Sequence, residues 1–205
     1  MRKIFIVLFL FCLCACAKRE ITNYPPSSGP IVAFGDSLTY GKGVNAEEAY
    51  PALLAKMWNR EVINLGISGQ TAVQGSARKA ELKELKPSFV LIEFGANDLF
   101  KKVPREQTKK ALEDIVNYTQ SIGAVAVLVD TGGNVLMKPY KKMIKKIAKE
   151  KNTLYIDGIM DGIFNNKNLK SDSLHPNEKG YQIIAEKIDK VLKPYINNEP
   201  EKRPL

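Results

Sequence analysis

Short, almost continuously apolar runs alternate along the chain with longer stretches in which apolar residues recur every three or four positions. Apolar runs of this length are typical of strands buried on both faces of a parallel sheet. They cover residues 31–34, 62–65, 89–94, 124–129 and 154–156. The amphipathic stretches predict helices near 46–58, 70–86, 105–121 and 138–151, and a last helix after Pro176.

This alternation predicts an α/β fold. Right-handed crossovers between parallel strands place helices on both faces of a sheet. We therefore expect a three-layer α/β/α sandwich with a doubly wound, mostly parallel five-stranded sheet of the flavodoxin-like type. A chain of 205 residues, 44% of them hydrophobic, suits one such domain, over residues 31–196, followed by a flexible polar tail over 197–205. In these sheets the working site lies outside the carboxyl ends of the strands.

The first 17 residues have the pattern of a secretory signal peptide, with a basic start and 14 apolar residues that are too few to span a bilayer. Leu13-Cys14-Ala15-Cys16 resembles a bacterial lipobox, which would remove residues 1–15 and acylate Cys16. Ala15-Cys16-Ala17 also fits the A-x-A cleavage pattern, which would release a soluble chain beginning at Lys18. We favour the lipoprotein, exported to a bacterial periplasm, with a proline-rich tether over residues 16–30.

Cysteine and histidine content limits the chemistry of the mature domain. All three cysteines lie in the leader, so no disulfide is expected in the domain. One histidine and no cysteine leave only carboxylates as metal ligands, so we expect neither a metal site nor a cofactor.

The chain is basic, with a net charge of +9. Removal of Arg2 and Lys3 from the 31 basic residues leaves 29 against 22 acidic ones, a net charge of +7. Part of the excess falls on one side of a predicted helix, at Lys138, Lys141, Lys142, Lys145, Lys146 and Lys149. Such a stripe is most simply a solvated helix face, and alternatively a surface that attracts anionic lipid, at about 1 kcal/mol per lysine. Nucleic acid is not expected, because no aromatic residues interleave with the lysines.

Polar residues follow the predicted strands at the edge where a site is expected. Each has an ordinary structural explanation as a helix cap or a turn residue. Four separate loops nevertheless bring a chemically coherent set to one rim: Gly35-Asp36-Ser37, Asn64-Leu65-Gly66-Ile67-Ser68-Gly69, Gly95-Ala96-Asn97-Asp98 and Asp172-Ser173-Leu174-His175.

Serine catalysis accounts for this set. A hydroxyl such as that of Ser37 needs a neighbouring base, and His175 is the only histidine in the chain. Asp172, three residues earlier, can hold the other ring nitrogen and fix the tautomer. The developing oxyanion needs donors, which the backbone N–H groups of Ser37 and Gly69 and the amide of Asn97 could supply.

At these residues the sequence resembles the SGNH, or GDSL, hydrolase family, from Ile31 to about Tyr195. The motifs G-D-S-L, G-A-N-D and D-S-L-H-P occur in the family's order. The resemblance implies that Ser37 is the nucleophile, that Asp172 and His175 complete the triad, and that Asn97 and Gly69 join Ser37 in the oxyanion hole, with Gly66 as the alternative glycine. The α/β-hydrolase pentapeptide G-x-S-x-G does not occur in the chain.

Within the family, the sequence is most similar to the periplasmic thioesterase/lysophospholipase branch, often called arylesterases. This implies a hydrolase of carboxylic esters or thioesters, with small to medium acyl chains, acting through an acyl-enzyme on Ser37. Two alternatives stay open. One is a carbohydrate O-acetylesterase acting on cell-wall glycan, and the other is a non-catalytic envelope lipoprotein that uses the fold for binding.

Overall fold

The computed structural model describes residues 20–197, so the signal peptide, Cys16 and the tail from residue 198 lie outside it. Its sheet contains β1 (Ile31–Gly35), β2 (Val62–Asn64), β3 (Phe89–Glu93), β4 (Val125–Val129) and β5 (Leu154–Ile156). The strand order is β2-β1-β3-β4-β5, and every neighbouring pair is parallel. The predicted doubly wound α/β sandwich is therefore confirmed, and the sheet is wholly rather than mostly parallel.

The longer helices correspond to the predicted amphipathic stretches, with two breaks, whereas two short helices, over residues 37–40 and 96–100, were not predicted. They are α1 (Ser37–Tyr40), α2 (Tyr50–Trp58), α3 (Ala72–Ala77), α4 (Glu81–Leu85), α5 (Ala96–Phe100), α6 (Arg105–Ser121), α7 (Lys138–Glu150) and α8 (Glu178–Ile196). Three 3₁₀ turns are η1 (Ala46–Glu48), η2 (Val135–Met137) and η3 (Lys167–Leu169). The stretch 46–58 is broken at Ala49, whose backbone is extended just before the first turn of α2, where Pro51 lies. The stretch 70–86 is broken after α3, which contains the poor helix formers Gly75 and Ser76.

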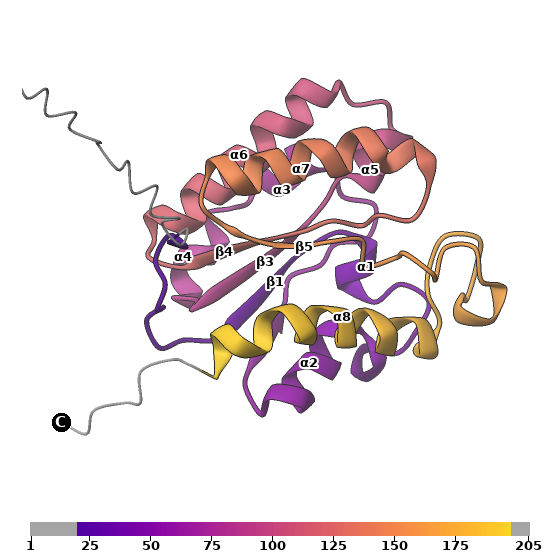
Figure 1. The fold of residues 1–205 in the computed structure, drawn as a ribbon, viewed down its shortest axis with the longest axis horizontal. Helices are drawn as coiled ribbons and strands as arrows, with labels where there is room; N and C mark the ends of the chain where they lie inside the picture. Colours follow the sequence, from indigo (N-terminus) through magenta and orange to yellow (C-terminus); the bar gives the residue numbers. More distant parts are fainter. Residues whose placement is uncertain (1–19, 198–205) are drawn as a thin grey trace, which may run out of the picture.

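The helices cover both faces of the sheet (Figure 1). On one face, Ile31 and Ala33 of β1 belong to the core formed with α2 and α8. On the other face, Val32 and Phe34 pack with residues of α3, α4, α6 and α7. Because successive side chains of a strand point to opposite faces, both halves of β1 are buried, which explains its unbroken apolar sequence. No helix within residues 20–197 is both long and apolar enough to cross a membrane.

Residues 20–30, expected to be part of a tether, instead pack against the domain. The Asn23 amide donates hydrogen bonds to the carbonyls of Gln120 (2.8 Å) and Ala124 (3.0 Å). The ring of Tyr24 meets that of Tyr195 edge-on, with 5.3 Å between centroids. Two hydrogen bonds to backbone carbonyls and an aromatic contact hold this segment in place, which its proline-rich composition does not indicate.

Candidate active site

The turn after β1 presents Ser37 at the start of α1. A Cβ at Gly35 would lie 2.1 Å from Oγ1 of Thr39 and 2.7 Å from the carbonyl oxygen of Glu93, so only glycine fits there. Asp36 is the N-cap, and its Oδ1 accepts the backbone N–H of Leu38 at 3.2 Å. The strand therefore ends in a tight turn whose next residue is the first of a helix, and this turn aims the Ser37 hydroxyl out of the sheet's carboxyl edge.

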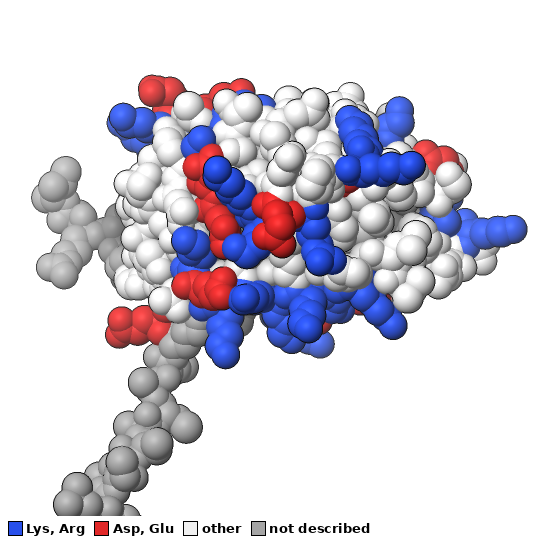
Figure 2. Space-filling view, turned by 90° about the horizontal axis from the view of Figure 1, so that it is seen from above, with Lys and Arg blue, Asp and Glu red and all other residues white. Residues whose placement is uncertain are grey.

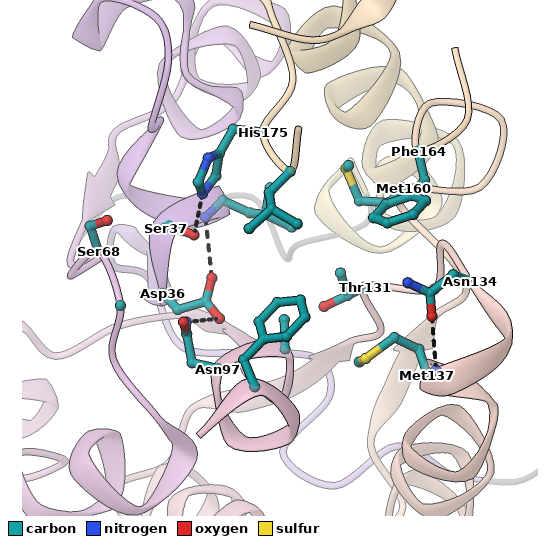
Figure 3. A pocket seen from close by; sticks show the side chains of 16 residues that line it. Asp36, Ser37, Ser68, Asn97, Thr131, Asn134, Met137, Met160, Phe164 and His175 are labelled. Carbon is teal, nitrogen blue, oxygen red and sulfur yellow. Dashed lines mark hydrogen bonds between the residues drawn. The ribbon is translucent and has the colours of Figure 1, made fainter. Parts of the chain in front are cut away.

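Ser37, His175 and Asp172 form a hydrogen-bonded series, of which Figure 3 shows the contact between His175 and Ser37. Nε2 of His175 lies 3.1 Å from Oγ of Ser37, and Nδ1 lies 2.8 Å from Oδ2 of Asp172. Oδ1 of Asp172 accepts the backbone N–H groups of Leu174 (2.7 Å) and His175 (2.8 Å). The two backbone N–H groups thus fix the Asp172 carboxylate, which in turn orients the His175 ring. The three predicted residues come together in the order that proton transfer from a serine requires.

The carboxyl group of Asp172 has a lowered pKa. Partial burial raises its pKa, but the hydrogen bonds from the His175 ring and from two backbone N–H groups outweigh that effect and lower the pKa to about 2. Asp172 therefore stays charged in any solution in which the domain is expected to work, and it can stabilise an imidazolium at His175.

The structure separates the two glycines between which the sequence left a choice. Gly69 lines the cavity beside Ser37, has φ of +80°, and has no atom within 4 Å of where a Cβ would stand. Gly66 packs so closely on α1 that a Cβ would lie 2.2 Å from the backbone nitrogen of Tyr40, and its N–H donates to Oδ1 of Asn64. Packing explains Gly66, and of the two glycines Gly69 is the one that lines the cavity.

Asn97 faces the same cavity, and its amide nitrogen is already hydrogen-bonded within the protein. Nδ2 donates to Oδ2 of Asp36 at 2.9 Å and to the carbonyl oxygen of Gln70 at 3.1 Å. Both hydrogens of the amide are used in this way, so an oxyanion above Ser37 would compete with Gln70 for one of them. The bond to Asp36 sets the plane of the amide.

The last residue of the G-A-N-D motif has a structural role. Asp98 is buried, its Oδ2 accepts the N–H of Ala72 at 2.9 Å, and its Oδ1 accepts the hydroxyl of Thr108 at 3.0 Å. Burial raises its pKa, which those two bonds partly offset. Asp98 therefore ties the start of α3 and the helix α6 to α5, the short helix that carries Asn97.

Sequence reasoning missed a buried acidic pair beneath Ser37. Glu93, the last residue of β3, is fully buried and contacts Asp36, which is 1% exposed. Burial raises the pKa of both carboxyl groups, and the negative charge of Glu93 raises that of Asp36 further, well above its ordinary value. A glutamate inside the apolar run 89–94 was the available signal, because glutamate is almost never fully buried without a partner.

A cavity of about 170 Å³ opens beside the Ser37 hydroxyl. Figure 3 shows the serine, the histidine and Asn97 on one side of it and Met137, Met160 and Phe164 on the other. The remaining wall includes Leu38, Ala96, Phe100, Thr131, Asn134 and Leu174. The chemistry at its floor needs no metal, and within residues 20–197 no group of three or more histidine, cysteine, aspartate or glutamate side chains is arranged to hold one.

A serine–histidine–aspartate series at the carboxyl edge of a flavodoxin-like sheet, beside an apolar cavity, defines the class of serine hydrolases to which the molecule conforms. The sequence model of the GDSL-like Lipase/Acylhydrolase family matches residues 33–183, and the chain belongs to that family. It is therefore an ester hydrolase, and the alternative of a non-catalytic binding protein is set aside.

Relatives of known structure and activity agree with this assignment. "Thioesterase 1/protease 1/lysophospholipase L1" of Escherichia coli K12 is 30% identical over 188 residues, which are 87% of this chain and 90% of that protein. The esterase EstA of Pseudoalteromonas, solved with monoethylphosphonate, is 28% identical with a TM-score of 0.76, covering 83% of this chain and all of that one. The crystal structure of TesA is 25% identical, also with a TM-score of 0.76, covering 81% of this chain and 99% of that one.

The different surroundings of the two glycines lead to a testable difference. Gly66→Ala should destabilise the domain by about 1–3 kcal/mol or more, because the α1 backbone must move away from the new methyl group. Gly69→Ala should cost only about 1–2 kcal/mol, from the left-handed backbone alone. Urea unfolding of the two variants measures this. A larger loss of stability for Gly69→Ala than for Gly66→Ala would contradict the assignment of Gly66 to packing.

Proposed function

We propose that the protein hydrolyses carboxylic esters or thioesters of small to medium acyl chains through an acyl-enzyme on Ser37. One observation carries the proposal: His175 Nε2 stands 3.1 Å from the Ser37 hydroxyl at the floor of an apolar cavity, with the other ring nitrogen 2.8 Å from Asp172. The nucleophile, its base and the space for an acyl chain thus meet at one place.

The mechanism follows from these contacts. His175 accepts the proton of Ser37 as its oxygen attacks the substrate carbonyl carbon, and Asp172 stabilises the resulting imidazolium. The N–H groups of Ser37 and Gly69 and the Asn97 amide bind the oxyanion. When the intermediate collapses, His175 gives its proton to the departing alcohol or thiol. Water, deprotonated by the same ring, then hydrolyses the acyl-enzyme and restores the free hydroxyl.

The cavity favours an apolar acyl group. A dry cavity of about 150 Å³ lined by Leu, Ile and Phe is known to hold benzene, so the space of about 170 Å³ here suits an acyl chain of roughly six carbons. Apolar residues continue around the mouth, where Phe100 is 53% exposed and Leu174 is 40% exposed. Few polar groups line the wall to bind glycan hydroxyls, which favours the acyl hydrolase over the carbohydrate O-acetylesterase.

The roles of the triad residues can be tested with single variants. Ser37→Ala should lower kcat for a nitrophenyl ester by at least about 10⁴-fold, because no nucleophile is left. Asp172→Asn should lower it by about 10²–10⁴-fold, because the asparagine amide would donate to Nδ1 and leave a proton on Nε2, where the serine proton must go. Ser68→Ala, at another serine of the same cavity, is the control and should retain activity. Near-native turnover by a folded Ser37→Ala variant would refute the nucleophile.

The substrate class can be tested with a series of nitrophenyl esters, repeated with acyl-CoA and lysophospholipid. Each buried methylene is worth up to about 0.8 kcal/mol, so kcat/KM should rise from acetyl to a maximum between butyryl and octanoyl and then level off as further carbons leave the cavity. The names of the relatives support testing thioesters and lysophospholipids. Strict preference for acetyl, with acetate released rapidly from O-acetylated glycan, would instead establish the carbohydrate esterase.

We also propose that the protein is exported to the periplasm and anchored there through an acylated Cys16, with the α7 lysines facing anionic lipid. Figure 2, which looks down on the side of the sheet covered by α6 and α7, shows basic side chains gathered on part of that surface. Lys138, Lys142, Lys145, Lys146 and Lys149 are exposed. Lys141 is paired with Asp157 at 2.5 Å and Lys146 with Glu150 at 3.6 Å, so these two add less to that surface.

Membrane fractionation and vesicle binding test the two contacts separately. Cys16→Ser should abolish lipidation, detected by mass spectrometry, and move the protein out of the membrane fraction. Purified protein without the leader should bind vesicles that contain phosphatidylserine, and Lys142→Glu with Lys145→Glu should weaken this binding. Lys179→Glu with Lys190→Glu, on α8, is the control with the same change in charge. An unmodified mature chain starting at Lys18 would refute the anchor, and equal binding by both double variants would refute the α7 contact.

A further inference from the structure

Two carboxyl groups meet directly beneath the turn that carries Ser37. Asp36 follows β1, Glu93 ends β3, and their side chains are hydrogen-bonded to each other. Both are fully enclosed, and within residues 20–197 no lysine, arginine or histidine forms an ion pair with either one. Two carboxyl groups in contact away from water cannot both be charged, so the pair keeps one proton.

Glu93 is held rigidly from two other elements. Its Oε2 accepts the hydroxyl of Thr39, on α1, at 3.1 Å, and its Oε1 accepts the hydroxyl of Thr131, after β4, at 3.1 Å. The hydroxyl of Thr39 is in turn 2.9 Å from that of Tyr50, which is fully buried on α2. The carboxylate therefore has one fixed position, and its remaining partner is Asp36.

Asp36 connects Glu93 to the turn at Ser37 and to the amide of Asn97. Its Oδ1 accepts the N–H of Leu38, which fixes the turn at Ser37, and its Oδ2 accepts the amide of Asn97. Figure 3 shows Asp36 lying between the serine and Asn97. Glu93 thus reaches the Asn97 amide through Asp36, and it reaches the turn at Ser37 through Asp36 and through Thr39 of α1. Glu93 itself is not among the residues that line the cavity.

We propose that Glu93 is a positioning residue for ester hydrolysis: by holding Asp36 against Asn97 and against the turn at Ser37, it aligns the donors that bind the oxyanion. The inference rests on the proposed roles of Ser37 and Asn97. Glu93 does not line the cavity and acts through Asp36, with Thr39 as a second contact to α1. A purely structural role would be served better by apolar side chains of similar size, because burying two acids is costly.

The shared proton makes this support sensitive to pH. The titratable groups that face the pair are Tyr50 on α2 and Tyr181 on α8, with the Asp172 carboxylate close to Tyr181. Burial and the charge of Glu93 raise the pKa of both tyrosines, so neither supplies a positive charge or a proton. When the pair loses its proton as the pH rises, two adjacent negative charges repel each other, and Asp36 leaves its place between Leu38 and Asn97.

Two substitutions at Glu93 test the proposal. Glu93→Leu should lower kcat by about 10- to 100-fold with KM within about two-fold, because misaligned donors weaken transition-state binding. Glu93→Gln should keep kcat within about five-fold at pH 7, because its amide N–H can donate to the Asp36 carboxylate in place of the shared proton. Thermal melting checks that each variant is folded. A folded Glu93→Leu variant with wild-type kcat, or a Glu93→Gln variant as impaired as Glu93→Leu, would overturn the proposal.

The pH profile of kcat distinguishes positioning from simple support of the fold, and the informative variant is Glu93→Gln. An amide does not titrate, so the ratio of kcat in Glu93→Gln to kcat in the wild type should rise between pH 7 and pH 10. Asp130→Asn is the matched control, because Asp130 is also a buried acid, with a pKa raised by burial to about 6, and its carboxyl bonds to the backbone of Gly158 and Gly132 rather than to Asp36 or Asn97. Its ratio should stay constant. A constant ratio for Glu93→Gln would overturn the proposal, whereas absence of wild-type hydrolysis would refute the esterase itself.

Discussion

The close approach of β1 and β3 at their carboxyl ends is the constraint on which the site depends. Gly35 pairs in parallel register with Glu93, and the missing side chain of Gly35 leaves room for the glutamate carbonyl and for Thr39. That closeness allows Asp36 to meet Glu93 out of water. From this contact follow the cap of α1, the direction of the Ser37 hydroxyl and the plane of the Asn97 amide. The catalytic edge is built on a glycine and a buried acid pair rather than on the loops alone.

Local patterns predicted the parts of the molecule that local sequence determines. Each strand needs only a short apolar run, and its bounds agree with prediction to within a residue. The triad could be inferred because His175 is unique and because parallel strands end at one edge. The pairing of Asp36 with Glu93 depends on a neighbour distant in the sequence. A pattern search along one segment cannot see such neighbours, although a lone glutamate in an apolar strand does draw attention.

The far wall of the cavity also could not be predicted from a pattern along one segment. It is formed by the segment after β4 and by Met160 and Phe164, which precede the histidine loop. Only glycine fits at position 132, because a Cβ there would lie 2.6 Å from Gly158 and from Asp161, where two loops are in contact. The residues of the reaction could therefore be predicted from the sequence. The shape of the cavity that accepts the acyl chain could not, because it depends on how separate loops pack together.

The packing of residues 20–30 limits how far the domain could stray from a lipid on Cys16. Only residues 17–19 would separate the acylated cysteine from the packed segment, and four chain steps reach at most about 14 Å. The packed segment contacts Asn152 and Gln120, near the edge where the strands begin, whereas the cavity opens where they end. With so short a link, the edge where the strands begin would stay next to the proposed lipid on Cys16, and the mouth would lie at the opposite edge of the domain.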